Sequence, residues 1–300
     1  MKHLLKLLDL SGEEIIGILD LADQLKYERR NHIPHKHLEG KSVGLIFQKS
    51  STRTRVSFET GIYQLGGQPL FLSSKDLQIG RGEPVQDTAR VLSRYLDGIM
   101  IRTFAQQEVE DLAKYGSIPI INGLTDFCHP CQVLADLMTI REHYAKLEGL
   151  KLAYIGDGNN MTNSLIVGCL KTGMKISCAC PEGYHPDPVV LEFAKGNPDF
   201  ELTGDPRQAV RDADVVYTDT WASMGQEDEK EARIKAFTGY QVNAELMALA
   251  NQGAMVQHCL PAYRGQEITD EVFEAHADEL FEEAENRLHA QKAVMVTLMK

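Results

Sequence analysis

The stretch "SVGLIFQKSSTRTRVSFET", residues 42–60, joins an apolar segment to a dense group of hydroxyl and arginine side chains. Residues 42–47 are short, apolar and partly β-branched, which predicts a buried strand. A helix is expected to follow from about residue 53 to 65, so the polar group lies where a strand ends and a helix starts. Backbone N–H groups point outward there with a partial positive charge. The polar group consists of Ser50, Ser51, Thr52, Arg53, Thr54 and Arg55.

This polar group exceeds what a helix start requires. One helix cap needs only one hydroxyl, so an ordinary capped helix with solvated arginines explains the group less well than an anion site does. Hydroxyl and guanidinium groups at a helix start can bind a phosphate without the lysine loop of a nucleotide-binding motif. The stretch therefore predicts an oxyanion site, with the ordinary helix cap as the alternative.

Strand-like and helix-like segments alternate along the rest of the chain, in two series. The first series runs through "GGQPLFLSS", "EPVQDTARVLSRYL", "DGIMIRT", "QQEVEDLAKYG", "IPIIN" and "HPCQVLADLMTIREHY". The second runs through "LKLAYIGDGNNMTNSLIVGCLKTG", "MKISCACPEG", "PVVLEFAKGN", "ADVVYTDTW" and "AMVQHCLPAYRG". Such alternation predicts parallel sheets with right-handed crossovers. The predicted fold class is α/β, with two doubly wound parallel-sheet domains joined by a helix near residues 134–150.

Several candidate functional residues fall at the ends of these strands. Ligands of parallel α/β sheets bind beyond the carboxyl ends of the strands. The segments found there are Arg102, His129–Pro130, "GDGNN" (156–160), "DTW" (219–221) and "HCLP" (258–261). Because they come from both halves of the chain, we expect an active site in the cleft between the two domains.

The bulk properties of the chain exclude some classes of partner. The 300 residues carry 31 basic and 43 acidic side chains, a net charge of −12, which argues against a nucleic-acid partner. No apolar run approaches the roughly 20 residues that a membrane span needs, so no membrane association is expected. The first twenty residues show helical spacing and no small-residue cleavage site, which predicts a helix rather than a signal peptide. We therefore expect a cytoplasmic protein.

Two groups of possible metal ligands are weak candidates. Cys128 and Cys131 have the C-x-x-C spacing of zinc and redox motifs, but no second pair completes a zinc site. His32, His35 and His37 lie in a polar segment that reads better as a linker before the first strand than as a metal site.

Three loops of the second half carry candidate binding groups. "GDGNNM" has a methionine where a dinucleotide-binding fingerprint needs a third glycine, so it suits an amino-acid carboxylate or ammonium better. The alternative is a turn in which Asn160 caps the next helix. Asp219 could hold a cationic amine beside a lid at 223–225, unless the segment is an ordinary loop. Cys259 could be partly thiolate near cations, unless it is a buried, inert cysteine.

Taken together, four segments resemble the signature segments of the ornithine carbamoyltransferases in order and spacing. They are "SSTRTRVSFE", "HPCQVLADL", "DTWASMGQE" and "HCLPAYRGQE", and the resemblance extends from the first helix to "EAENRLHAQKAVMVTLM" at the end. Ser-Thr-Arg-Thr-Arg and His-Pro-x-Gln are shared with aspartate carbamoyltransferases. Asp-x-x-x-Ser-Met-Gly and His-Cys-Leu-Pro point to the ornithine enzymes. The chain departs from the pattern at Tyr263, where the family usually has histidine.

The resemblance implies transfer of the carbamoyl group from carbamoyl phosphate to the side-chain amine of L-ornithine, giving L-citrulline and phosphate. It implies a step of the arginine-biosynthesis or urea-cycle type, without a metal or an organic cofactor. Residues 1–140, completed by a C-terminal helix at 286–300, would bind carbamoyl phosphate, and residues 141–285 would bind ornithine. A homotrimer with shared sites is implied, because in the family the loop with Gln78 reaches a neighbouring subunit. The alternatives are a transcarbamoylase for putrescine or another amine, or a non-catalytic ligand-binding paralogue.

The resemblance also implies a set of site residues. Carbamoyl phosphate would be bound by Ser51, Thr52, Arg53, Thr54, Gln78, Arg102, His129, Pro130, Cys131, Gln132, Cys259, Leu260 and Arg287. Ornithine would be bound by Asn160, Asp219, Ser223 and Met224, and the catalytic residues would be Cys259, Asp219, Arg102 and His129. His129 and Arg287 would contact the carbamoyl oxygen, and Gln132 the carbamoyl NH₂. Asp219 would orient the amine and Cys259 would accept its proton, with a phosphate oxygen as the alternative final acceptor.

Overall fold

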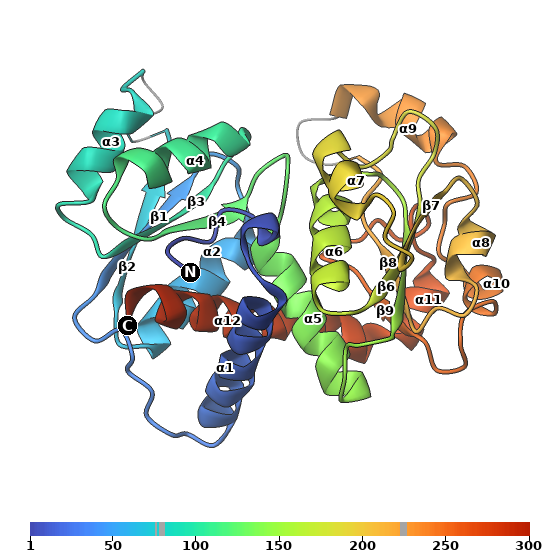
Figure 1. The fold of residues 1–300 in the computed structure, drawn as a ribbon, viewed down its shortest axis with the longest axis horizontal. Helices are drawn as coiled ribbons and strands as arrows, with labels where there is room; N and C mark the ends of the chain where they lie inside the picture. The colour runs from blue at the N-terminus through green and yellow to red at the C-terminus, as the bar shows by residue number, and fades with distance from the viewer. Residues whose placement is uncertain (76, 78–81, 223–226) are drawn as a thin grey trace. The chain divides into compact units, whose positions relative to one another are not determined.

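The structure, a computed structural model, describes residues 1–75, 77, 82–222 and 227–300. The chain divides into two compact units (Figure 1). The first unit contains residues 1–138 and 286–300, and the second unit contains residues 139–285. Each unit is built on one parallel sheet, as the alternation of strands and helices predicted.

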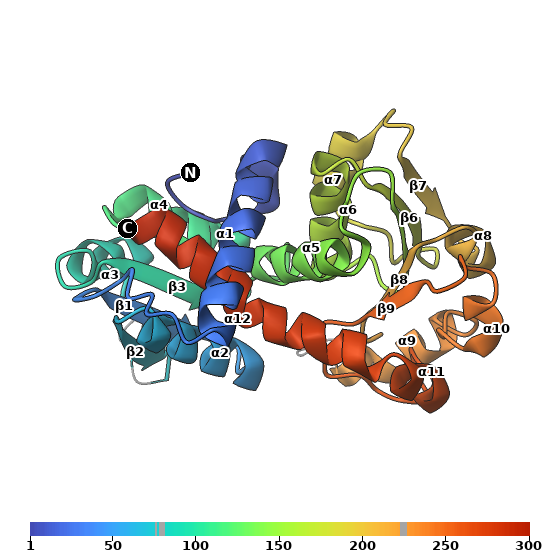
Figure 2. The ribbon, with the colours of Figure 1, turned by 90° about the horizontal axis from the view of Figure 1, so that it is seen from below.

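The first unit has a sheet of four parallel strands in the order β2-β1-β3-β4. The strands are β1 (Ser42–Phe47), β2 (Gln68–Ser73), β3 (Gly98–Arg102) and β4 (Ile120–Leu124). Helices α3 (Val85–Leu92) and α4 (Gln106–Tyr115) cover one face, and α2 (Thr52–Gln64) lies on the other (Figures 1 and 2). Because β1 is central, its carboxyl end delivers the chain directly to the start of α2.

The second unit has a sheet of five parallel strands in the order β7-β6-β5-β8-β9. The strands are β5 (Lys151–Ile155), β6 (Lys175–Ala179), β7 (Phe200–Thr203), β8 (Val215–Thr218) and β9 (Met255–Gln257). Helices α6 (Asn160–Lys171) and α7 (Pro188–Ala194) cover one face of this sheet. The other face carries α8 (Pro206–Val210), α10 (Ala244–Met247) and α11 (Asp270–Ala275), and α9 (Lys230–Ala236) follows β8 in the chain.

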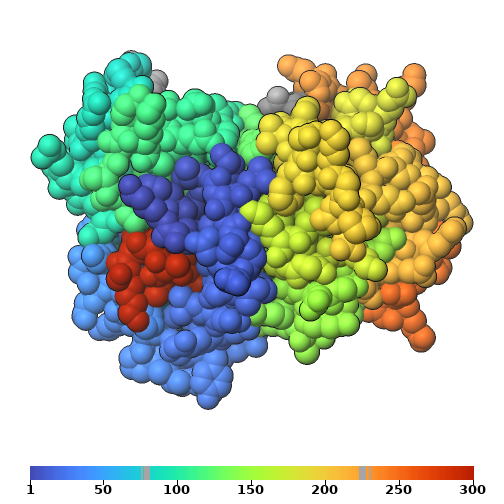
Figure 3. Space-filling view, viewed as in Figure 1, coloured from blue at the N-terminus to red at the C-terminus, as the bar shows by residue number. Residues whose placement is uncertain are grey.

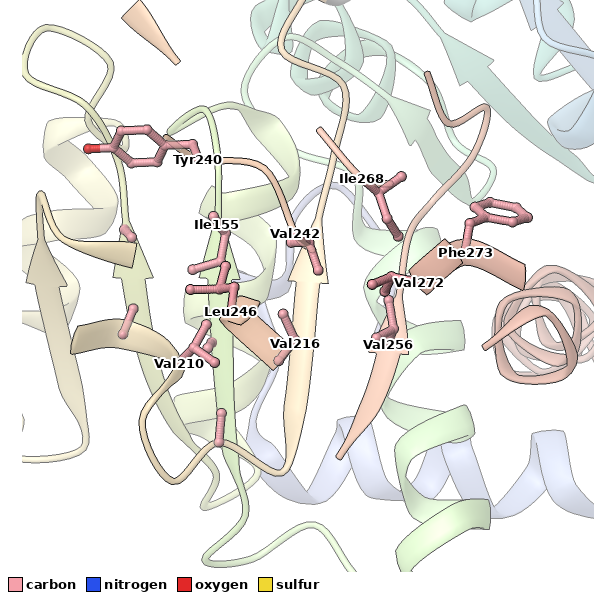
Figure 4. Close-up of a cluster of buried hydrophobic side chains, with 14 of the residues drawn as sticks. Ile155, Val210, Val216, Tyr240, Val242, Leu246, Val256, Ile268, Val272 and Phe273 are labelled. Carbon is pink, nitrogen blue, oxygen red and sulfur yellow. The ribbon is translucent and has the colours of Figure 1, made fainter. Parts of the chain in front are cut away.

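A hydrophobic core fills the space between β5, β8, β9 and the helices on that second face (Figure 4). Ile155, Val216 and Val256 contribute from the three strands, and all are fully buried. Their partners are Val210, Tyr240, Val242, Leu246, Ile268, Val272 and Phe273. This core fixes β8 and β9 side by side, so the residues that follow the two strands are neighbours.

Two long helices contribute residues to both units, because the boundaries fall inside α5 (Pro130–Tyr144) and α12 (Ala277–Met299). In the first unit α12 lies against α1 (Gly12–Arg30) and α2. Lys26 of α1 donates to Asn286 Oδ1 at 2.6 Å, and a Cβ on Gly61 of α2 would lie only 3.2 Å from Lys292 Cγ. The predicted return of the C-terminal helix to the N-terminal unit is therefore confirmed, and the end of α12 is visible in red beside the N-terminal residues in Figure 3. No helix of the described residues has the length and apolar character required to span a membrane.

The prediction of a helix over the first twenty residues is wrong for their first half. Leu4 forms an isolated parallel bridge with Ile121, and its N–H donates to Ile120 O at 2.9 Å. The α-helix begins only at Gly12, where Ser11 and Glu14 form a capping box. Leu4 is buried at the edge of β4, whereas Leu7 and Leu10 are buried in and just after a short 3-10 helix, Leu7–Asp9. The three-residue spacing of these leucines therefore does not belong to one α-helix.

Gly116 ends α4 without a left-handed cap. Its φ is −84°, which any residue can adopt. Glycine is required there because a Cβ would lie 2.7 Å from the carbonyl oxygen of Leu112.

Lys292 is a buried cation of the first unit, on α12. Its Nζ lies 2.7 Å from His35 Nε2 and donates to Gln64 Oε1 at 3.1 Å. His35 Nδ1 lies 2.7 Å from the carbonyl oxygen of Ile33, so Nδ1 carries the ring hydrogen and Nε2 accepts from Lys292. Burial lowers the pKa of Lys292 to about 8, and the nearby Arg29 acts in the same direction.

We expect the free energy of unfolding of the parent protein to rise between pH 8 and pH 10 because of Lys292, and this contribution to be absent in the Lys292→Met variant. The unfolded chain keeps the Lys292 proton up to a pKa of about 10.4, whereas the folded protein releases it from about pH 8, so folding becomes more favourable as pH rises through this window. The effect is on the order of 1 kcal/mol after allowance for solvent screening. Urea unfolding of both proteins at the two pH values measures it. An equal change of unfolding free energy with pH in the two proteins would contradict it.

Candidate active site

The first unit places the hydroxyl cluster at the start of α2, immediately after β1. Ser51 is the N-cap, and its Oγ accepts the Thr54 N–H at 3.2 Å and lies 3.1 Å from Thr54 Oγ1. Thr52 and Arg53 occupy the first turn of the helix. The Ser51 hydroxyl thus caps α2, and the helix does not require the neighbouring polar side chains for capping.

Two arginines from distant parts of the chain converge on the buried hydroxyl of Thr54. Arg287, on α12, donates from Nη2 at 3.0 Å, and Arg102, at the end of β3, lies at the limit of hydrogen-bonding distance, with Nη1 3.5 Å away. The two residues are only 4% and 8% exposed. Guanidinium groups stay charged in proteins, and two such charges around one hydroxyl repel each other. A bound anion would be attracted by both and would relieve this repulsion.

His129 lies beside these cations and is uncharged. Burial holds the pKa of His129 well below its usual value of 6.5, and the charges of Arg287 and Arg102 lower it further. It precedes Pro130, the first residue of α5. Gln132, in the first turn of that helix, donates its amide nitrogen to Asp136 Oδ1 at 2.8 Å. The imidazole is therefore a neutral hydrogen-bonding group in a positively charged surrounding.

The two cysteines around His129 are protonated thiols. Burial raises the pKa of Cys128 and that of Cys131 to about 12 in each case. Cys131 donates to the carbonyl oxygen of Asn122 at 3.4 Å, and Cys128 lies 3.3 Å from the Asn122 amide nitrogen. A metal ligand or redox pair needs thiolates, so this environment argues against both uses.

In the second unit, the "GDGNN" loop leads from β5 into α6. Asn159 is the N-cap, and its Oδ1 accepts from the N–H groups of Met161 and Thr162 at 2.9 and 3.3 Å. Its Nδ2 donates to Asp219 Oδ2 at 2.9 Å. The alternative in which Asn160 caps this helix is therefore wrong by one residue, and Asn160 is the first residue of α6.

Asp219 and Cys259 follow β8 and β9, which are neighbouring parallel strands. Cys259 Sγ donates to Asp219 Oδ1 at 3.1 Å, and the same oxygen accepts the Thr220 N–H at 2.7 Å. Asp219 is 5% exposed, and Cys259 is half-buried, whereas the other five cysteines are buried. Both oxygens of this carboxylate thus accept hydrogen bonds, which holds it in one orientation.

The turn after Cys259 is held by a buried imidazole. Leu260 has a φ of 56°, and its N–H donates to His258 Nδ1 at 2.9 Å. His258 Nε2 therefore carries the ring hydrogen and lies 3.1 Å from Glu267 Oε1. The Tyr263 N–H donates to the same oxygen at 2.6 Å. The residue that departs from the family pattern thus contributes through its backbone, while its side chain is half exposed.

A buried ion pair lies next to Asp219, and the sequence did not reveal it. Arg233 donates from Nη1 to Asp157 Oδ2 at 2.7 Å and to the carbonyl oxygen of Trp221 at 3.0 Å. Burial raises the pKa of Asp157 to about 6, although Arg233 opposes the shift. The negative charge of Asp219 raises the pKa of Asp157 as well, because the two carboxylates repel each other. Arg233 keeps Asp157 paired and leaves Asp219 as the carboxylate beside Cys259.

Half of the predicted site residues that the structure describes, seven of fourteen, interact in one of two sets. Ser51, Thr54, Arg102, His129 and Arg287 interact in the first unit, and Asp219 and Cys259 in the second. Gln78, Ser223 and Met224 lie outside the described residues, as does the expected lid at 223–225.

Comparison with known families assigns both halves of the chain. Residues 2–142 match the model described as "Aspartate/ornithine carbamoyltransferase, carbamoyl-P binding domain". Residues 148–298 match "Aspartate/ornithine carbamoyltransferase, Asp/Orn binding domain". The chain belongs to the aspartate/ornithine carbamoyltransferase family.

Relatives within this family match along their full length. The ornithine carbamoyltransferase of Geobacter metallireducens is 55% identical, over 100% of this chain and 99% of the relative. That of Oceanobacillus iheyensis is 57% identical, over 99% of this chain and 94% of the relative. Among solved structures, the ornithine carbamoyltransferase from Pyrococcus furiosus is 51% identical with a TM-score of 0.95, over 99% of this chain and 97% of that one.

One glycine of the "GDGNN" loop is required by a close approach of two backbones in this family member. A Cβ on Gly158 would lie 2.2 Å from the carbonyl carbon of His185 and 2.3 Å from Pro186 N. The Gly158 N–H donates to Tyr184 O at 2.8 Å, so the loop and the segment after β6 are held face to face.

We expect Gly158→Ala to lower the stability of the second unit by about 3 kcal/mol or more, because backbone atoms must separate to admit the methyl group. Gly204→Ala is the matched control, since its Cβ would meet only the Tyr240 hydroxyl at 4.0 Å. Thermal unfolding of both variants measures the difference. Equal melting temperatures would show that the loop can move aside without cost.

Proposed function

We propose that this chain is an ornithine carbamoyltransferase, which transfers the carbamoyl group of carbamoyl phosphate to the side-chain amine of L-ornithine and releases L-citrulline and phosphate. The observation that carries the proposal is the pair Asp219–Cys259 at 3.1 Å, an acidic site for an amine in a family that acts on carbamoyl phosphate. Full-length relatives named ornithine carbamoyltransferase support the same acceptor. Putrescine and other amines are the alternative acceptors.

Carbamoyl phosphate binding is assigned to the first unit. The phosphate would accept hydrogen bonds from Ser51, Thr52, Arg53 and Thr54 and from the N–H groups that begin α2. Arg102 adds a charge-assisted bond from the end of β3, and Arg287 lies beside it, where it would support the carbamoyl oxygen. Pro130, Cys131 and Leu260 would contact the substrate through their backbones, and Gln78 is retained as a proposed contact from a neighbouring subunit.

The carbamoyl group would be activated by electrostatics rather than by proton transfer from histidine. Since His129 is neutral, it can donate one hydrogen bond to the carbonyl oxygen, while the positive charge comes from Arg102 and Arg287. Charge placed at this oxygen stabilises the tetrahedral oxyanion more than the planar ground state. The amide nitrogen of Gln132 donates to Asp136, so Gln132 would meet the carbamoyl NH₂ through Oε1, which accepts.

Ornithine binding is assigned to the second unit. Asp219, oriented by Asn159 and Thr220, would hold the side-chain amine, and Asn160 would contact the amino-acid part. Ser223 and Met224 complete the proposed set. Transfer requires the uncharged amine, and free amines of this kind have a pKa of about 10.4. A group in the site must therefore take a proton, and we assign that role to Cys259, whose own thiol proton would first pass to Asp219 along the hydrogen bond that joins them. Asp219 and a phosphate oxygen are the alternative acceptors.

We further propose a homotrimer that acts in the cytoplasm, in an arginine-biosynthesis or urea-cycle type of step. Large apolar side chains are exposed on α2 and on the edge strand β2, namely Val56, Tyr63, Leu70 and Phe71. Exposed apolar residues beside a sheet edge are typical of a surface that another subunit covers. Sedimentation of the purified protein as a monomer would contradict this assembly.

A substrate panel tests the proposed reaction. Purified protein is incubated with carbamoyl phosphate and, in separate reactions, ornithine, putrescine, lysine or aspartate, and the carbamoylated product is identified. We expect citrulline from ornithine and little product from the others. If putrescine or aspartate gives more product than ornithine, that compound is the acceptor in place of ornithine. If no amine gives product, a non-catalytic paralogue is favoured.

We expect Arg53→Ala to lower turnover by at least about 10²-fold while the protein stays folded, because a group that stabilises the leaving phosphate is removed. Arg55→Ala is the matched control from the same turn. Arg55 donates to Glu59 at 2.9 Å and lies over the Phe71 ring, away from the proposed set. Steady-state kinetics of the two variants give the answer. Near-parental activity of Arg53→Ala would refute the phosphate site.

We expect Cys259→Ser to lower kcat by about 10²–10⁴-fold if Cys259 accepts the amine proton, because a serine hydroxyl ionises far less readily. The parent rate should rise toward alkaline pH, where more amine is uncharged. Cys178→Ser, at a buried position on β6, is the control that should affect stability alone. If Cys259→Ser matches the parent from pH 6 to pH 9, the role passes to Asp219 or to the phosphate.

A further inference from the structure

Strand β9, which ends just before His258 and Cys259, lies at one edge of the sheet in the second unit. It pairs with β8 on one side, and the Met255 N–H donates toward that side, to Asp214 O at 3.0 Å. Successive residues of a strand direct their N–H groups to opposite sides. The N–H groups of Val256 and His258 therefore point away from β8, to the side where the sheet has no further strand among the described residues.

Helix α12 supplies side-chain acceptors on that side. Glu279 Oε2 accepts the Val256 N–H at 2.9 Å, and Glu283 Oε2 accepts the His258 N–H at 2.9 Å. The spacing of Glu279 and Glu283 along the helix matches that of Val256 and His258 along the strand. Four residues of a helix rise about 6 Å, and two residues of a strand rise about 6.6 Å. Two glutamates one helical turn apart can therefore bind alternate N–H groups of a strand, in the place of another strand.

The two glutamates differ in their surroundings. Glu279 is half-buried and also meets His276 Nδ1 at 2.8 Å. Glu283 is 0% exposed. Burial of a carboxylate is costly unless strong hydrogen bonds compensate for it, and a bond from a backbone N–H to a carboxylate is one of these. For Glu283, this compensating hydrogen bond comes from the N–H group of His258, the residue directly before Cys259.

The backbone of Cys259 is held on both sides. Before it, the His258 N–H is bound by Glu283, and after it, the Leu260 N–H is bound by the His258 ring. The Cys259 side chain has to point at Asp219 from this short segment. Loss of the Glu283 bond would leave a buried N–H group without its carboxylate, and the end of β9 would shift to find another acceptor.

We propose that Glu283 is a positioning residue that fixes the end of β9 so that the Cys259 thiol meets Asp219. The proposal rests on the proposed carbamoyl transfer only for its kinetic consequence. The same helix carries Arg287 one turn later, so α12 provides one residue that orients the proposed amine site and one that contacts the proposed phosphate site.

A double-mutant cycle tests the proposal. We expect Glu283→Leu to lower kcat on the order of 10- to 100-fold, as expected for a small displacement of a reacting group. In a Cys259→Ser background, Glu283→Leu should have little further effect, because Glu283 acts through Cys259. Equal losses in both backgrounds would reduce Glu283 to a general stabilising residue and overturn the proposal.

Matched variants separate position from stability. Glu283→Gln keeps an acceptor oxygen and should retain most of the rate. Glu279→Leu removes the equivalent bond at Val256, two residues farther from Cys259, and should lower the melting temperature with a smaller loss of kcat. Equal kcat losses in Glu279→Leu and Glu283→Leu would contradict the proposal. Glu283→Thr, which is polar but too short to reach the N–H group, provides a second loss variant if the leucine variant does not fold.

A measurement without substrate distinguishes this inference from the proposed function. Cys259 is the half-buried cysteine of the six, so iodoacetamide should label it first. The labelling rate and its pH profile should change in Glu283→Leu or Glu283→Thr and stay near the parent in Glu283→Gln. Unchanged labelling in both loss variants would overturn the positioning role. A parent protein that fails to make citrulline, with labelling changed as expected, would refute the reaction and leave the positioning role standing.

Discussion

Two buried guanidinium groups around the hydroxyl of Thr54 are the constraint that organises the first unit. Arg102 comes from the end of β3, Arg287 from α12, and Thr54 from the first turn of α2. Burying two cations close together costs free energy, because they leave water and repel each other. The packing of α12 against α1 and α2 holds Arg287 in this place, and a bound anion would reduce the repulsion. The same charges, together with burial, keep His129 neutral.

The second unit is organised around the opposite charge. Asp219 accepts hydrogen bonds from Asn159, Thr220 and Cys259, so its carboxylate is held in one orientation. A second carboxylate close by would compete for the same cation, but Arg233 pairs with Asp157. The chain as a whole carries a net charge of −12, yet its first unit brings two buried arginines together at Thr54. Local arrangement, rather than overall charge, therefore decides which ligand each unit favours.

Sequence patterns predicted what depends on neighbours along the chain. The alternation of strands and helices was sufficient for the two parallel sheets, and strand ends carried Arg102, Asp219 and Cys259. Patterns did not predict contacts between distant segments, such as the ion pair of Asp157 with Arg233. They also did not distinguish two adjacent asparagines as the helix cap, and the cap is Asn159 rather than Asn160. The cap residue directly precedes the first helical residue, so a helix that begins at Asn160 is capped by Asn159. Strand β7 was missed because it is short and only half-buried, without the apolar run of the central strands.

The outer edge of β9 is covered by a helix rather than by a sixth strand. A strand would satisfy the outward N–H groups with its backbone and would end where the sheet ends. A helix satisfies its own backbone internally, so it needs only Glu279 and Glu283 to bind β9 and can continue unbroken through Asn286 and Arg287. One uninterrupted segment therefore protects a strand edge, holds the backbone before Cys259 and delivers a guanidinium to Thr54. This arrangement is possible because four residues of a helix and two residues of a strand rise by nearly the same distance. It requires acidic side chains at buried or half-buried helix positions, where apolar side chains would otherwise be favoured.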